Sequence, residues 1–131
     1  MAFGTLAFDT LQTSDSKKTG TSQTLDTSYV YNGTAKAWSA FNASSGTPTN
    51  LDNLNVSSLT DTATGQTTLN FTNSFTNASY ATNATNGGGG NKNALYQDTA
   101  TSSVLIRTQT MSAQADTDHD HVSSSHHGDL A

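Results

Sequence analysis

Threonine, serine and asparagine dominate this chain, and no other feature constrains its fold as much. Together they make up 53 of 131 residues. β-Branched threonine suits half-exposed strands, whereas serine and asparagine compete with helix hydrogen bonds and favour turns. No segment has a convincing helical pattern of any length. The sequence therefore predicts an all-β fold.

Large apolar residues are scarce. Leu, Ile, Val and Phe together supply 20 of 131 residues, yet only 11% of residues are charged and the net charge is -5. The chain is therefore polar without the self-repulsion typical of disordered acidic segments. Burial of so few apolar side chains barely offsets the conformational entropy lost on folding, about 1.5 kcal/mol per ordered residue. We therefore expect stabilisation by assembly into a homo-oligomer.

The clearest local pattern is a hairpin in residues 55–75, NVSSLTDTATGQTTLNFTNSF. In its second arm, Leu69, Phe71 and Phe75 fall on one face, and Gly65 lies in a connection rich in turn-forming residues. In the first arm, Val56 and Leu59 are three residues apart. They can share a face only if a bulge intervenes at residues 57–58.

Other short alternating segments predict further strands separated by polar connections. These segments are a first strand with Leu6 and Phe8, a strand through Tyr29, Tyr31 and Gly33, a strand with Val104 and Ile106 on one face and Leu105 and Arg107 on the other, and a last strand from His121 to His127. This arrangement is typical of a small antiparallel β-sandwich. We expect residues 1–28 to form an extended arm and loop, and residues 29–131 to form the sandwich.

The single tryptophan lies in GTAKAWSAFN, residues 33–42. On a strand, Ala35, Ala37 and Ser39 share one face and Trp38 lies on the other. Trp38 could fill the centre of a thin core, or it could form an exposed platform that stacks on a sugar. Because tryptophan is highly buried on average, the first interpretation is favoured.

Composition and termini argue against several classes of protein. The chain has no cysteine and therefore no disulfide or thiolate site. MAFGTLAFDT predicts neither a signal peptide nor a membrane span, so no membrane insertion is expected. With five basic and ten acidic residues, no basic patch is available for nucleic acid.

Several motifs occur in the order seen in one group of proteins. AKAWSAFN, then NVSSLTDTATGQTTLNFTNSFTNASYA and finally GDLA resemble a domain recurrent in tail fibres and other virion proteins of tailed phages, particularly marine ones. GTLAFDTLQTSD resembles a short leader that precedes this domain. The likeness covers about residues 4–13 and 33–81 and the last four residues. Where the family has an apolar strand before GDLA, this chain has HVSSSHH.

The resemblance implies a virion structural protein, most simply a tail-fibre or appendage subunit that contributes to host attachment. Phage fibres are usually trimers, so the expected partners are two further copies, other virion proteins, and a host surface glycan or receptor. A capsid decoration protein without a host ligand is one alternative. A glycan depolymerase is another.

The enzyme alternative has little support in the sequence. All ten acidic residues are aspartates, scattered along the chain, and nothing fixes the separation of any two. No G-x-S-x-G motif is present. The chain contains six N-x-[ST] triplets, and a chain this rich in Asn, Ser and Thr is expected to contain such triplets by chance. The run of glycines at 87–90 lacks phosphate-loop spacing and predicts a flexible hairpin or trimer-edge loop. We therefore expect no catalytic residues and no bound cofactor.

One segment gathers metal-binding side chains, DTDHDHVSSSHH at 116–127. On an extended strand His119 and His121 share a face. In a trimer with this strand near the axis, three such pairs would surround one transition-metal ion with six imidazoles. Trimeric phage fibres use His-x-His in this way. A solvated polar tail or last strand is the alternative interpretation.

Overall fold

The computed structural model describes residues 10–12, 24–88 and 90–131, which fall into two compact units divided between Thr34 and Ala35. The sequence-based division lay after residue 28. In the first unit, β1 (Thr10–Gln12) pairs antiparallel with β2 (Thr24–Asp26), and α1 (Thr27–Gly33) follows. The predicted first strand around Leu6 and Phe8 lies outside the described residues.

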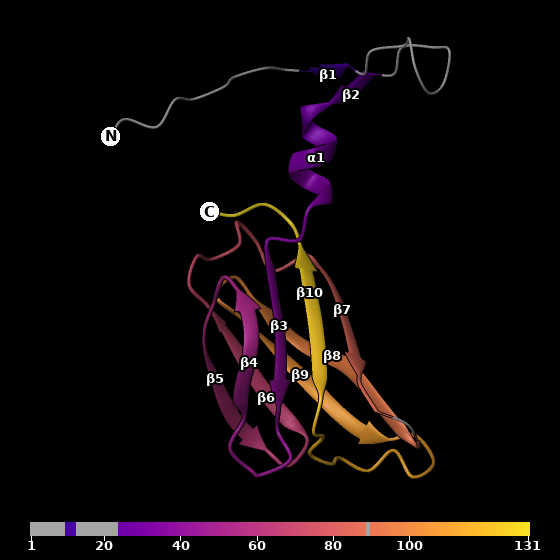
Figure 1. Ribbon diagram of the computed structural model, residues 1–131. Coiled ribbons are helices and arrows are strands. Elements are labelled where there is room, and N and C mark those ends of the chain that lie inside the picture. Colours follow the sequence, from indigo (N-terminus) through magenta and orange to yellow (C-terminus); the bar gives the residue numbers. More distant parts are fainter. Residues whose placement is uncertain (1–9, 13–23, 89) are drawn as a thin grey trace. The chain divides into compact units, whose positions relative to one another are not determined.

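The second unit is an all-β sandwich, as predicted. Two antiparallel sheets of four strands pack face to face, with orders β4-β3-β10-β7 and β5-β6-β9-β8 (Figure 1). The strands are β3 (Ala37–Asn42), β4 (Thr49–Leu54), β5 (Val56–Ala63), β6 (Gln66–Phe71), β7 (Ala81–Asn86), β8 (Lys92–Ala100), β9 (Ser103–Thr110) and β10 (Val122–His127). We call the two sheets the β3–β10 sheet and the β6–β9 sheet after their central strands.

The central strands follow the alternation expected of residues that face a core on one side only. Burial alternates residue by residue along β3, β6 and β10, and along most of β9. Val104 and Ile106 lie on the face of β9 opposite Leu105 and Arg107, as predicted, and it is the first pair that faces inward. The β5–β6 hairpin is confirmed, and its register shifts between Val56 and Ser58, where the bulge was predicted.

An aromatic cluster and a set of aliphatic side chains fill the space between the sheets. The Phe71 ring packs edge-on against Phe75 and Tyr80, with centroids 5.1 and 5.8 Å apart. His126 joins this cluster, with its ring centroid 5.5 Å from that of Phe71. The buried apolar residues are Ala37, Phe41, Ala43, Val56, Leu69, Phe71, Phe75, Tyr80, Val104, Ile106 and Val122.

Trp38 does not fill the core, so that prediction was wrong. The predicted alternation holds, but the small residues are on the buried side: Ala37 and Ser39 are 0% and 1% exposed. Trp38 is half-buried on the outer face of the β3–β10 sheet, beside Leu54 of β4 and Ser125 of β10. Small inward residues let the sheets approach, and Phe41 fills the space instead.

Two further local predictions were wrong. Residues 29–33 belong to α1 rather than to a strand. A strand needs a neighbour to pair its backbone groups, whereas a helix pairs them within itself. The glycine run at 87–90, of which residue 89 lies outside the described residues, comes between β7 and β8, which belong to different sheets. The predicted hairpin was therefore wrong, and the alternative of a trimer-edge loop stays a prediction. Within the described residues, no helix has the length and apolar character to cross a membrane.

Candidate functional site

The segment after β9 folds back along the end of that strand. Asp116 forms an antiparallel bridge with Gln109, and the Thr110 amide donates to the Ala115 carbonyl at 2.9 Å. The Thr117 amide donates to the Thr108 carbonyl at 3.0 Å. Because β6 begins only at Gln66, residues 115–117 take the place beside β9 that β6 leaves open. We call residues 115–117 the return segment.

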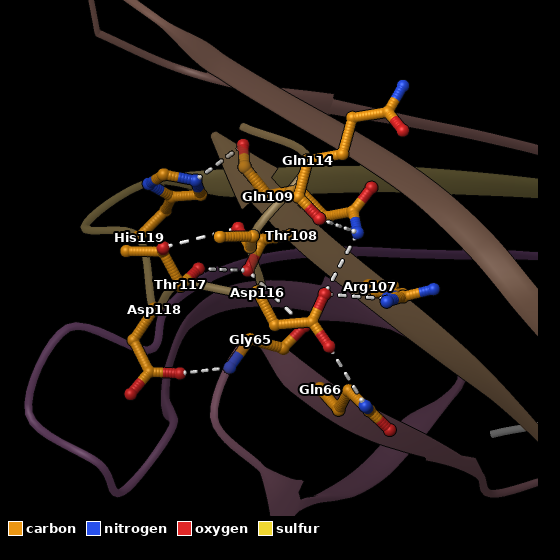
Figure 2. Close-up of polar contacts among 11 residues, drawn as sticks. Gly65, Gln66, Arg107, Thr108, Gln109, Gln114, Asp116, Thr117, Asp118 and His119 are labelled. Carbon is orange, nitrogen blue, oxygen red and sulfur yellow. Dashed lines mark hydrogen bonds and ion pairs between the residues drawn. The ribbon is translucent and has the colours of Figure 1, made fainter. Parts of the chain in front are cut away.

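Gly65 and Asp118 fix the return segment to the β5–β6 turn. The Asp118 carboxylate accepts a hydrogen bond of 2.6 Å from the Gly65 amide (Figure 2). The Thr108 hydroxyl donates to the Thr117 carbonyl at 2.7 Å. Backbone pairing and side-chain bonds therefore hold the return segment against the sheet at several points.

Asp116 is the centre of the polar contacts on this outer surface. Its Oδ1 accepts from Arg107 Nε at 2.7 Å and from Gln109 Nε2 at 2.9 Å, and its Oδ2 accepts from Gln66 Nε2 at 3.3 Å (Figure 2). The hydrogen bond from Arg107 is the main cause that lowers the pKa of Asp116, and the bond from Gln109 adds to it. The carboxylate is therefore held ionised and already occupied by three donors.

Beside this network the outer face of the β6–β9 sheet is hollowed. We call this depression, of about 470 Å³, the Arg107 hollow. Its volume lies in the range of about 300 to 1,000 Å³ usual for small-ligand sites. It is lined by Asn93, Leu95, Arg107, Gln109, Thr110, Met111 and Gln114. Four of these residues are partners across two neighbouring strands: on β8 and β9, Asn93 lies opposite Gln109, and Leu95 lies opposite Arg107.

The structure separates the two residues predicted to bind metal. His119 is 3% exposed, and its Nε2 lies 3.2 Å from the Gln109 carbonyl oxygen. His121 is exposed, and its ring lies against Gly87. The two residues precede β10, so they lack the strand alternation that placed them on one face. Among the described residues, no group of three His, Cys, Asp or Glu side chains could hold a metal ion.

Sequence reasoning missed the residues that form the Arg107 hollow. Arg107 is the only arginine of the chain, and it was predicted to lie on the face of its strand opposite Val104 and Ile106, which the structure shows to be the outer face. Its carboxylate partner is nine residues away and reaches it only because the chain reverses at 111–114. The one available signal was that the single arginine lies in a predicted strand, on the face opposite Val104 and Ile106.

The arrangement is suited to binding. A guanidinium, several amide groups and two apolar side chains border one depression, and the adjacent carboxylate is occupied. Comparisons with protein-family models, with curated proteins and with solved structures found no match to this chain.

Proposed function

We propose that this protein is a structural component of a tailed-phage virion, a fibre or appendage subunit that contributes to host attachment without catalysis. The observation that carries the proposal is the Arg107 hollow. It opens on the outer face of the β6–β9 sheet and is bordered mainly by polar side chains that are able to form hydrogen bonds. Such a surface suits the hydroxyl-rich glycans that cover bacterial cells.

Two further features support a virion role. The ordered motifs from AKAW to GDLA resemble virion domains of tailed phages, and the division into two compact units suits a subunit with separate assembly and binding parts. The neighbourhood of the hollow favours binding over hydrolysis. Glycoside hydrolysis usually needs two carboxyl groups, one of them able to give up a proton. Asp116 is held ionised by three donors instead.

Immunogold labelling tests where the protein resides. Antibodies raised against the purified protein should label the tails of virions of the phage that encodes it. Purified protein added to host cells should reduce adsorption of those virions. Label on the capsid with unchanged adsorption would instead support a decoration protein. Virions without label would disprove the proposal.

A second measurement tests the depolymerase alternative. Purified protein is incubated with host surface polysaccharide, and reducing ends are counted over time. We expect no increase over a sample without protein. A steady release of reducing ends would establish hydrolysis and replace the binding proposal.

A further inference from the structure

The Arg107 side chain is fixed at one end and open at the other. Its Nε donates to Asp116 Oδ1 at 2.7 Å. A guanidinium carries five N–H donors. Among the described residues, none accepts a hydrogen bond from the two terminal nitrogens of Arg107, and the side chain is 34% exposed. The bond at Nε therefore orients the group, while the edge formed by Nη1 and Nη2 remains available.

Asp116 is a poor competitor for that edge. Its two oxygens already accept from Arg107, Gln109 and Gln66, and its backbone is held by the bridge to Gln109. Asp116 is also absent from the residues that line the hollow, where Arg107 is the one charged side chain in the described part of the chain. The wall of the hollow thus presents a positive group and no negative one.

The rest of the lining suits a sugar ring. Asn93 and Gln114 supply amide groups that can donate to or accept from hydroxyls. Leu95 and Met111 supply apolar surface, and Met111 is 61% exposed. A ligand that combines an anionic group, several hydroxyls and an apolar C–H face would use each of these.

We propose that the Arg107 hollow binds a carboxylate-bearing sugar of a cell-surface glycan. The planar carboxylate accepts two parallel hydrogen bonds from Nη1 and Nη2 of Arg107, a geometry that a guanidinium matches and an ammonium does not. Asp116 acts as a positioning residue that orients the guanidinium. The inference rests on the proposed attachment function and names the chemical class of its ligand.

Nuclear magnetic resonance gives a direct test, because the chain has one arginine and one tryptophan. The Arg107 Nε–H signal reports on the hollow, and the Trp38 indole N–H signal reports on the other sheet. The probes are sodium D-glucuronate, sodium D-galacturonate and sodium N-acetylneuraminate, each paired with its methyl ester. Sodium acetate and glucose 6-sulfate complete the set. The shift of the Arg107 signal during titration gives a Kd for each probe. For at least one sugar acid this Kd should be at least tenfold lower than for its ester, and the Trp38 signal should not move.

Three variants locate the interaction. The side-chain amide signals of Asn93 and Gln114, which line the hollow, follow binding in the two Arg107 variants, because these variants lack the Nε–H group. Arg107→Gln should weaken binding of that sugar acid at least tenfold. Arg107→Lys should also weaken it, because the charge remains but the planar fork is lost. Lys92→Gln is the matched control, since it removes a positive charge that pairs with Asp120 and lies outside the lining of the hollow. It should leave the affinity within about twofold, because an exposed pair contributes little. An unchanged Trp38 signal verifies that each variant is folded.

Several results would overturn the inference. Equal shifts with acetate would show an adventitious ion only, and equal affinity for the esters would show a neutral ligand. Tighter binding of the sulfated sugar, or binding of none of the three acids, would also exclude it. Adsorption assays separate this failure from failure of the proposed function. If wild type and Arg107→Gln block adsorption equally, attachment stands and the carboxylate site does not.

Discussion

Gly65 has a backbone conformation and surroundings that only glycine tolerates. Its φ is +70°, and a Cβ atom there would lie 2.5 Å from the Thr108 carbonyl oxygen and 2.6 Å from the Thr117 amide nitrogen. Both are backbone atoms of the paired segments, so neither can move alone. We expect Gly65→Ala to lower the free energy of unfolding by about 3 kcal/mol, from left-handed strain plus displacement of the return segment.

Gly46 provides the matched control for this substitution. It has the same φ of +70°, but nothing lies within 4 Å of its hypothetical Cβ. Gly46→Ala should therefore cost only the conformational strain, roughly 1 to 2 kcal/mol. Urea unfolding of both variants measures the difference. Equal losses of stability would show that the contacts around Gly65 do not matter.

His126 is a buried histidine whose charge state links stability to pH. Its side chain is fully buried, with Thr82 Oγ1 and Ser124 Oγ each 3.1 Å from a ring nitrogen. Desolvation by burial lowers its pKa from 6.5 to about 4, and the charge of His127 adds to the shift. The unfolded chain therefore binds a proton between about pH 6.5 and pH 4 that the folded chain does not.

Stability should accordingly fall as pH decreases through this window. The loss attributable to His126 is up to about 3 kcal/mol, at about 1.4 kcal/mol per pH unit. Chemical denaturation at pH 7, 6, 5 and 4 measures it. His126→Gln should reduce the slope, whereas His127→Gln, at a half-buried outward position, should largely retain it. A wild-type stability that is flat from pH 7 to pH 4 would contradict this account.

The strands were the most predictable elements, because successive side chains of a strand point to opposite faces, so that counting residues tells which of them share a face. The bulge near Ser57 and the separation of Val104 and Ile106 from Leu105 and Arg107 onto opposite faces are local consequences of that rule. Counting does not tell which side faces the core, and this is why Trp38 was misplaced. The alternation rule also does not predict the return segment, because the contact of Arg107 with Asp116 depends on where the chain reverses. Residues 122–127, VSSSHH, form the central strand β10 although only one of them, Val122, is a large apolar residue.

β3 allows the two sides of one strand to be compared directly. Phe41 is 0% exposed, whereas Trp38 is half-buried on the outer face. Phe41→Ala should lower the free energy of unfolding by roughly 3 to 5 kcal/mol through loss of burial and creation of a cavity. Trp38→Ala should cost only about 1 kcal/mol. Thermal or urea unfolding ranks the two, and a greater loss at Trp38 would reverse the assignment of faces.

The core of the described chain lies entirely in the second unit. Every buried apolar residue falls within Ala35–Ala131, and α1 contains no buried residue. In α1, Tyr29 is 73% exposed and Val30 is 45% exposed. The sandwich therefore has its own source of stability, while the helix presents apolar side chains that contacts between chains could cover. We therefore predict that folding depends on the second unit and that assembly depends on the first.

Removal of residues 1–34 should therefore separate assembly from folding. We expect the full chain to sediment as a trimer of the 13.6 kDa subunit, with a melting temperature that rises with protein concentration because association stabilises the folded state. The shortened chain should remain folded, with dispersed amide signals, but sediment as a monomer whose melting temperature is independent of concentration. Tyr29→Ser in the full chain should weaken assembly without unfolding the sandwich. A full chain that is monomeric, or a shortened chain that still forms trimers, would contradict the assignment of assembly to the first unit.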